Sequence, residues 1–330
     1  MKKYLNDIFF EYIGEFFSGI IFAIHKETFT ASYPKDMTMR LQRTLKQEVT
    51  FEGIGLHTGK QVKACLKPAP RDTGIMMMRS DKDITIKASV NSVTDTAFAT
   101  TLGFNGSRIK TVEHVLAALA GLGIDNTIIE VNGSEIPILD GSSLELTNLI
   151  IQAGIAKQGK KRPYIKVTHP VSITDGNAEI SVFPYDGRRI TYRIHHNHHL
   201  LGEQQLSLDL TEETFLMEIA PARTYGFLKD VEYLRAQGLA KGGSLDNAVI
   251  VGESEILNTT GLRFKDEFVR HKILDLIGDL SLCGFPIYGH IVANKSGHTT
   301  NMKFLKKLLI ARDSWELVSE LDQQPAYICS

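Results

Sequence analysis

The chain has 330 residues, of which 43% are hydrophobic and 23% are charged, and its formal net charge at pH 7 is −1. This length predicts about two domains with sizeable cores, and the balanced charge offers no basic footprint for nucleic acid. The cysteines Cys65, Cys283 and Cys329 are widely spaced and form no Cys-x-x-Cys pattern. They therefore indicate a reducing compartment, which is the cytoplasm.

The first 41 residues carry an apolar stripe at helical spacing between Leu5 and Ile24, with acidic residues on the opposite side. The acidic residues interrupt any signal-peptide core, and the stripe is too short and too mixed to span a bilayer. Two interpretations stay open. Either this extension makes a peripheral contact with a membrane, or translation starts at Met37 or Met39 and the extension has no structural meaning.

Strand-like runs alternate with a few helices in each half of the chain. The segment Gln158-Gly-Lys-Lys-Arg-Pro163 is charged and ends in proline, so it predicts a linker. We therefore expect domain I at residues 42–158 and domain II at 159–312, followed by a tail at 313–330 that has a short helix around Trp315. The expected strands are 61–66, 126–131, 164–167, 180–182 and 288–293, and the two helices that matter most are 111–121 and 268–279.

The second of these helices carries a histidine and a carboxylate four residues apart, His271 and Asp275. Such positions share one helix face, with Cβ atoms about 5–6 Å apart, so both side chains can bind one metal ion. His114 on the first helix offers a third ligand. Two histidines and one aspartate leave one open position on a tetrahedral zinc ion, which is the pattern of a catalytic site. A His-x-x-x-Asp pair alone is more often an ion pair or a polar pair in the core.

A weak internal repeat favours the metal site. The two histidine segments resemble each other at an offset of 157 residues, the difference between positions 271 and 114. This offset predicts one histidine ligand in each half of the protein. The matching pairs are Val112 with Val269, His114 with His271, Leu116 with Ile273, Leu119 with Leu276, and Gly121 with Gly278.

Three further side chains complete the predicted chemistry. Glu113 stands beside His114 without being needed as a ligand, so it suits the role of general base in a metallohydrolase. Asp279 lies about 12 Å along the helix axis from His271, too far to share the metal. We expect it to hold His298 protonated, as the acid or electrophile opposite Glu113. A Ser-Gly turn before His298 predicts that its ring lies at a sheet edge.

Several separate motifs, in order between residues 43 and 310, carry a family resemblance. The chain resembles UDP-3-O-acyl-N-acetylglucosamine deacetylase, the zinc enzyme of early lipid A synthesis in Gram-negative bacteria. The stretches that match are Gly55-Leu-His-Thr-Gly-Lys60, Thr111-Val-Glu-His114, Gly121-Leu-Gly-Ile-Asp-Asn126, Glu135-Ile-Pro-Ile-Leu-Asp-Gly141, Ala222-Arg-Thr-Tyr-Gly-Phe227, Phe268-Val-Arg-His-Lys272 and Lys295-Ser-Gly-His298.

The resemblance implies hydrolysis of the N-acetyl group of UDP-3-O-[(R)-3-hydroxyacyl]-N-acetylglucosamine, which releases acetate. It also implies that Thr224 helps polarise the substrate carbonyl, and that Lys272 and Lys295 meet the nucleotide diphosphate. Ferrous iron in place of zinc stays open, and so does the choice between Glu113 and His298 as the group that protonates the leaving amine. The remaining implied roles are one zinc ion per chain on His114, His271 and Asp275, Glu113 as general base, His298 as catalytic histidine, and Asp279 as the partner of that histidine.

A short amphipathic helix after Thr224 places Leu228, Val231 and Leu234 on one side. Such a stripe usually packs in a core. Here the resemblance implies that the stretch, together with Gly243, Ser244 and Ile250, belongs to an insert that encloses the acyl chain of the substrate.

The resemblance further implies an α+β fold of two similar domains, each a sandwich of helices packed on β-sheet, with the active site between them. The expected partner is the UDP-linked acylated glucosamine, bound by a monomer in the cytoplasm or at the inner face of the inner membrane. A zinc amidohydrolase on another acylated sugar would keep the metal residues but lose the two lysines or the insert. A catalytically silent binding protein would lack Glu113 or His298, and both are present.

Two other motifs resemble binding sites but predict ordinary loops or turns. The tract His195-His-Asn-His-His199 lies at the end of a strand-like run, where neighbours point to opposite faces. It therefore predicts a solvated loop better than a metal site. The segment Lys241-Gly-Gly-Ser244 lacks the spacing of a phosphate-binding loop and predicts an ordinary turn.

Overall fold

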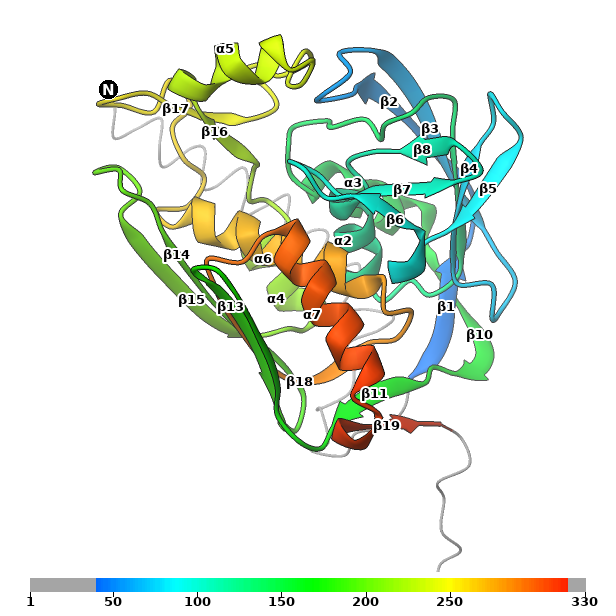
Figure 1. Cartoon of the computed structure of the whole chain (residues 1–330). Helices are drawn as coiled ribbons and strands as arrows, with labels where there is room; N and C mark the ends of the chain where they lie inside the picture. Colours follow the sequence, from blue (N-terminus) through cyan, green and yellow to red (C-terminus); the bar gives the residue numbers. More distant parts are fainter. Residues whose placement is uncertain (1–39, 320–330) are drawn as a thin grey trace, which may run out of the picture. The chain divides into compact units, whose positions relative to one another are not determined.

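The computed structural model describes residues 40–319 (Figure 1). The predictions for the apolar stripe at 5–24, for Cys329 and for the end of the tail lie outside the described residues. Within residues 40–319, no helix is both long and apolar enough to cross a membrane.

The described part of the chain is a mixed α+β protein, as predicted for the fold class. Its α-helices are α2 (Glu113–Gly121), α3 (Leu144–Ala153), α4 (Glu212–Thr214), α5 (Leu228–Ala236), α6 (Glu267–Ser281) and α7 (His298–Ile310), with a π-helical turn at Phe215–Ile219 and short 3₁₀ turns at Val90–Ser92 and Arg312–Ser314. Its strands are β1 (Leu41–Leu45), β2 (Val49–Ile54), β3 (Gln61–Pro68), β4 (Ile75–Arg79), β5 (Ile84–Lys87), β6 (Val93–Asp95), β7 (Thr101–Phe104), β8 (Ser107–Ile109), β9 (Thr127–Val131), β10 (Ile155–Lys161), β11 (Tyr164–Val167), β12 (Val171–Asp175), β13 (Ala178–Phe183), β14 (Arg188–His195), β15 (Glu203–Asp209), β16 (Tyr225–Phe227), β17 (Val249–Val251), β18 (Ile287–Asn294) and β19 (Trp315–Val318).

The strands form two larger sheets and three small ones within the described residues. One larger sheet has the order β2-β3-β9-β4-β5, and the other follows β12-β13-β18-β11-β19, with β14 between β15 and β18. Strand β3 shows why such strands form, because Val62, Ala64 and Leu66 alternate with more exposed residues and turn one apolar face to the core. The small sheets are β1-β10, β6-β7-β8 and β16-β17.

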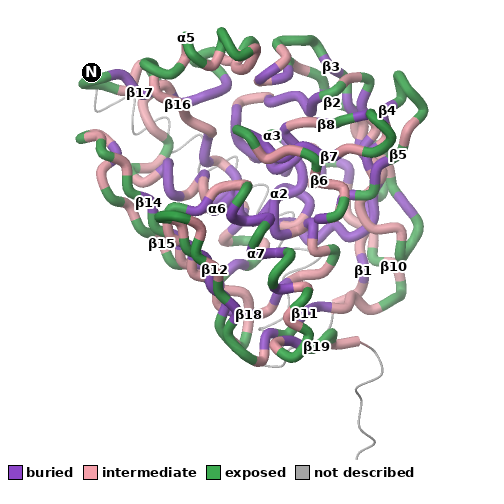
Figure 2. Tube along the Cα trace, in the orientation of Figure 1, coloured by how far each residue is buried: buried purple, intermediate pink, exposed green. Residues whose placement is uncertain are grey.

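Helices cover the larger sheets and meet each other at the centre. Helices α6 and α7 pack side by side, α6 against β14 and β15 and α7 against β12 and β13 (Figure 1). Helix α3 contacts β2 and α2, and α2 in turn packs along α6. Figure 2 shows both α2 and α6 as largely buried. The helices that carry the predicted ligands therefore form the middle of the core.

Two glycines allow this close packing. A Cβ atom added to Gly278 of α6 would lie 2.1 Å from the backbone oxygen of Glu113, the first residue of α2. A Cβ atom on Gly121, at the other end of α2, would lie 2.2 Å from the ring of Phe215. Because no side chain fits at either point, the helix backbones approach one another directly.

Two local predictions were wrong. Gln158 to Lys161, predicted as linker, belong to strand β10, which pairs with β1 because its backbone groups are satisfied by residues from the start of the described chain. The domain boundary itself stays a prediction. Trp315 begins strand β19, not a helix, and pairs with Val167 of β11. His298 follows Ser296 and Gly297, which connect β18 to α7, and it is the first residue of α7; its place at a sheet edge stays a prediction.

Candidate metal centre

Helices α2 and α6 bring three potential metal ligands together. The side chains of His114, His271 and Asp275 each offer one ligand atom, all within 4.8 Å of one another, and all three residues are buried. Asp275 Oδ1 lies 3.3 Å from His271 Nε2 and 3.7 Å from His114 Nε2. The two residues four apart on α6 thus share a face, as their spacing predicted.

The surroundings of His271 keep its imidazole neutral and leave Nε2 free to bind a metal ion. Its Nδ1–H donates to the backbone oxygen of Ala222 at 3.1 Å, which leaves Nε2 directed toward Asp275. Burial lowers the pKa of His271 to about 3, and the Asp275 carboxylate offsets only part of that effect. A neutral imidazole with its second nitrogen hydrogen-bonded to a carbonyl is the form in which histidine binds metals.

Asp275 is held as a carboxylate. Burial raises its pKa, but the charge of Lys272 and the adjacent His271 and His114 together lower it by more, to well below its usual range. Lys272 Nζ donates to Asp275 Oδ2 at 2.6 Å. One carboxylate oxygen is therefore occupied by the lysine, and the other faces the two histidines.

This donor set fits a metal ion. Two ligands at bonds of about 2.0–2.1 Å and a tetrahedral angle stand about 3.3 Å apart, close to the observed separations of 3.3 and 3.7 Å. Two imidazole nitrogens and one carboxylate oxygen suit zinc or ferrous iron.

A carboxylate and a third histidine lie beside the triad. Glu113 is buried, and its Oε1 lies 3.7 Å from His298 Nε2. Burial raises the pKa of Glu113, and His298 and His114 offset only part of this. Burial lowers the pKa of His298, but the carboxylates of Asp279 and Glu113 raise it by more, to about 10. The pair therefore combines a poised proton acceptor with a protonated imidazole.

The carboxylate of Asp279 accepts hydrogen bonds from three side chains, one of which is that of His298. Its Oδ2 accepts a bond of 2.8 Å from His298 Nδ1 and another of 2.8 Å from Asn301 Nδ2. Its Oδ1 accepts a bond of 2.6 Å from the hydroxyl of Thr100. The sequence suggested Asp279 as partner of His298 but gave no reason to choose Thr100 or Asn301, because nothing in their spacing links them to the helices.

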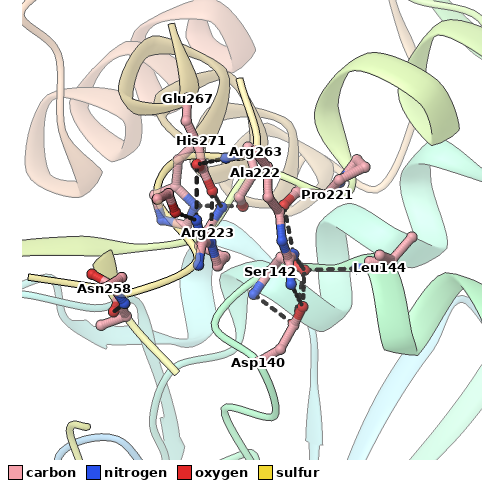
Figure 3. A network of polar contacts seen from close by, with 12 residues as sticks. Asp140, Ser142, Leu144, Pro221, Ala222, Arg223, Asn258, Arg263, Glu267 and His271 are labelled. Carbon is pink, nitrogen blue, oxygen red and sulfur yellow. Dashed lines mark hydrogen bonds and ion pairs between the residues drawn. The ribbon is translucent and has the colours of Figure 1, made fainter. Parts of the chain in front are cut away.

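A buried ion pair fixes the start of α6 (Figure 3). The backbone N–H and Nε of Arg223 donate to Glu267 Oε1 at 3.0 and 2.8 Å, and the N–H of Arg263 donates to Oε2 at 2.6 Å. Arg223 also follows Ala222, whose carbonyl receives the bond from His271. The sequence motif contained Arg223, but only the structure places it opposite Glu267.

Three other predicted site residues lie on separate segments, before β16, after β18 and on α6. Thr224 is half-buried, and its backbone N–H donates to Gly141 O at 2.7 Å. Lys295 is exposed and has a left-handed φ of 52°. Lys272 pairs with Asp275 in this structure, so its contact with a diphosphate stays a prediction.

Helix α5 is not a core helix. None of its residues is buried, and Leu228 is 49% exposed while Val231 and Leu234 are half-buried. The apolar stripe therefore does not fill the protein interior. Gly243 and Ile250 are half-buried and Ser244 is exposed, and their role around an acyl chain stays a prediction.

The segment after α5 is fastened to the turn between β2 and β3. Lys241 N–H donates to His57 O at 3.3 Å, and Gly242 N–H donates to Leu56 O at 3.0 Å. The buried carboxylate of Glu135 in turn accepts the backbone N–H of His57 and the hydroxyl of Thr111, at 2.8 and 2.9 Å. The turn at 241–244 is thus hydrogen-bonded to residues 56 and 57, and Glu135 connects His57 to Thr111, two positions before Glu113.

His195 ends strand β14, and the rest of the histidine tract forms the loop that follows, as predicted, but one member contacts the site region. His195 and His199 are exposed, whereas His196 Nε2 lies 3.1 Å from the hydroxyl of Tyr225. The ring of Tyr225 packs edge-on near His271, with 6.3 Å between ring centroids. Within residues 40–319, the tract contributes to no group of three metal-binding side chains.

A buried His-His-Asp triad with an adjacent glutamate and a protonated histidine defines a metal-dependent hydrolase. Comparison with known proteins agrees. Residues 42–310 match the family model of UDP-3-O-acyl N-acetylglycosamine deacetylase. The chain therefore belongs to the UDP-3-O-acyl N-acetylglycosamine deacetylase family.

Relatives from several bacteria support the assignment. A UDP-3-O-acyl-N-acetylglucosamine deacetylase of Thermodesulfovibrio yellowstonii is 52% identical over 282 residues, which cover 86% of this chain and 96% of the relative. Proteins of the same name from Syntrophus aciditrophicus and Histophilus somni are each 48% identical, over 88% and 86% of this chain and 92% and 94% of the relatives.

Proposed function

We propose that the protein is a zinc-dependent deacetylase of lipid A biosynthesis. It hydrolyses the N-acetyl group of UDP-3-O-[(R)-3-hydroxyacyl]-N-acetylglucosamine and releases acetate and UDP-3-O-acyl-glucosamine. The observation that carries the proposal is the buried triad of His114, His271 and Asp275 beside Glu113 and His298, in a chain of this family.

The triad holds one zinc ion, with ferrous iron as the alternative that the donor set also suits. When bound, such an ion polarises a carbonyl group and lowers the pKa of water from about 15.7 to about 7. The neutral His271 and the ionised Asp275 are ready to bind it without first losing a proton.

Glu113 acts as the general base. Its Oε2 accepts the backbone N–H of Thr100 at 3.0 Å, so this oxygen is fixed, while Oε1 faces the site and His298. Because its pKa is raised by burial, Glu113 accepts a proton from the attacking water more readily than an exposed glutamate.

His298 stabilises the negative charge that develops on the acetamide oxygen during attack. Its raised pKa keeps the ring protonated, and Asp279 fixes its orientation. The hydroxyl of Thr224 is the proposed second donor to this oxygen. Either His298 or Glu113 then gives a proton to the leaving amine.

Substrate binding uses the surfaces around this centre. Lys272 and Lys295 are the proposed partners of the diphosphate, since Lys binds phosphate as a point charge. Helix α5 with Gly243, Ser244 and Ile250 is the proposed enclosure for the acyl chain, which is consistent with an apolar stripe that the protein core does not bury. We further propose two similar helix-on-sheet halves, a monomer, and a cytoplasmic location.

The proposal is tested by deacetylation of UDP-3-O-acyl-N-acetylglucosamine with purified full-length protein, with the metal content measured in parallel. Wild type with one bound metal should release acetate, and Glu113→Ala should bind the metal without turnover. Absence of turnover by the metal-loaded wild type would exclude this substrate. A full rate in Glu113→Ala would refute the assignment of the base. UDP-N-acetylglucosamine without the acyl chain is the matched poor substrate.

A further inference from the structure

Thr100 donates hydrogen bonds to two carboxylates of the site, those of Glu113 and Asp279. The backbone N–H of Thr100 donates to Glu113 Oε2 at 3.0 Å, and its hydroxyl donates to Asp279 Oδ1 at 2.6 Å. Thr100 directly precedes β7, whereas Glu113 lies on α2 and Asp279 on α6. Its side chain is fully buried, with 0% exposure. Thr100 therefore joins the two helices from a third element.

The backbone of Thr100 also anchors the start of α2. Its carbonyl accepts the N–H of Val112 at 3.3 Å, one residue before Glu113. Bonds at both the N–H and the C=O of Thr100 thus fix the first turn of α2 relative to β7. These backbone bonds remain when the side chain is replaced, so a substitution isolates the hydroxyl group.

The hydroxyl also reaches the catalytic histidine. Its oxygen lies 3.2 Å from His298 Nδ1, and that nitrogen lies 2.8 Å from Asp279 Oδ2. Because an ionised carboxylate only accepts hydrogen bonds, Nδ1 carries a proton, and this N–H is shared between Asp279 and the Thr100 oxygen. The Thr100 hydroxyl therefore donates to Asp279 and accepts from His298.

We propose that Thr100 is a positioning residue for the deacetylation, acting through its hydroxyl on Asp279 and His298. The hydroxyl holds the Asp279 carboxylate and the His298 ring in one arrangement, so that Nε2 of His298 faces Glu113 Oε1 across 3.7 Å. The β-branched side chain of threonine has few χ1 rotamers, which keeps the hydroxyl in place. This inference rests on the proposed function, because it assigns a role in that reaction.

Two substitutions separate hydrogen bonding from packing. Thr100→Val keeps the shape of the side chain and removes the hydroxyl, whereas Thr100→Ser keeps the hydroxyl and removes the methyl group. Partners of this kind typically contribute about 10- to 100-fold to activity. We expect Thr100→Val to lower kcat by at least about tenfold with KM within about twofold, and Thr100→Ser to stay within about threefold of wild type.

The neighbouring Thr101 supplies the matched control. It is buried with 1% exposure, and within residues 40–319 its hydroxyl has no hydrogen-bond partner. Thr101→Val therefore changes the same atoms in the same strand region without removing a bond, and its kcat should match wild type. Metal content and Tm are measured for all variants, since a role in folding alone would change these along with the active fraction.

A second readout does not depend on turnover. In metal-loaded wild type, the His298 Nδ1–H should give a downfield proton NMR signal that is absent in His298→Gln. This signal should persist in Thr100→Ser and Thr101→Val, and shift or disappear in Thr100→Val. If wild type shows the signal but does not deacetylate the substrate, the proposed function fails while the hydrogen-bond arrangement stands.

The proposal is overturned if Thr100→Val is as active as wild type or more active than Thr100→Ser, because packing would then be the only role of the side chain. It is equally overturned if Thr100→Val loses metal or Tm in proportion to its activity, or if its NMR signal equals that of wild type.

Discussion

Helices α6 and α5 differ most clearly in how the protein surrounds them. Twelve of the fifteen residues of α6 are buried, among them Glu267, His271, Asp275 and Asp279, whereas none of the nine residues of α5 is buried. Packed side chains of this kind have fixed positions, as chemistry at a metal requires. A helix with no buried residue can adjust to a flexible ligand. Changes in α6 and its contacts should therefore affect metal binding and kcat, and changes in α5 should affect KM.

Removal of the metal should have the largest effect. A chelator is expected to abolish deacetylation and to lower Tm, because a ligand present at 100 times its Kd stabilises the folded state by about 2.7 kcal/mol. Added zinc should restore both. Thermal unfolding with and without chelator measures this, and His271→Ala is the control, since its Tm should not respond to chelator. An equal response in that variant would show that the chelator acts elsewhere.

The next largest effect is expected for Glu113→Gln. The amide has the shape of the carboxylate but cannot accept the proton, so kcat should fall by about 100- to 10,000-fold. Metal content should stay at the wild-type level, because Glu113 is not in the triad. Initial rates with metal analysis test this, and Glu145→Gln on the exposed face of α3 is the control with unchanged kcat. A loss of metal in Glu113→Gln would make it a ligand instead.

Gly278→Ala tests how closely α6 approaches α2 at their crossing. A Cβ atom would lie 2.1 Å from Glu113 O, so the variant should lose about 1–3 kcal/mol of unfolding free energy and part of its metal affinity. In an open helix position the same change would instead stabilise by about 1 kcal/mol. Urea unfolding measures the difference, with Gly226→Ala as control, since nothing lies within 4 Å of its Cβ position.

The smallest effect is expected on α5. Leu228→Ala and Leu234→Ala should each raise KM for the acylated substrate by about fivefold, which corresponds to the loss of about 1 kcal/mol of apolar contact. Tm should not change, because neither residue is buried. Glu232→Ala on the exposed side of α5 is the control. If these leucine variants instead lower Tm while KM is constant, α5 serves the fold and not the substrate.

The sequence revealed the parts of the site that depend on local geometry. His271 and Asp275 could be paired because helical spacing alone puts them on one face, and the repeat added His114. Strands such as β11 and β18 followed from runs of apolar and β-branched residues, whereas the α+β class was implied by the family resemblance. These features need no knowledge of tertiary contacts.

Features that depend on contacts between distant segments could not be predicted from the sequence. Residues 158–161 look like a linker, yet β1 supplies their hydrogen-bond partners from more than a hundred residues away. Trp315 joins a strand because β11 lies beside it. Thr100 is an ordinary threonine in the sequence, and only the fold brings it to Asp279 and Glu113. No local pattern records such contacts.

The contact between Gly278 and Glu113 also bears on how the core can change during evolution. At this crossing the distance between the helices is limited by backbone atoms, which are present whatever side chains surround them. Leucine, valine and isoleucine can therefore replace one another around α2 and α6 at a modest cost in stability, while the separation between His114 and His271 is preserved. Exchanges among the apolar core residues should therefore change metal affinity less than they change thermal stability.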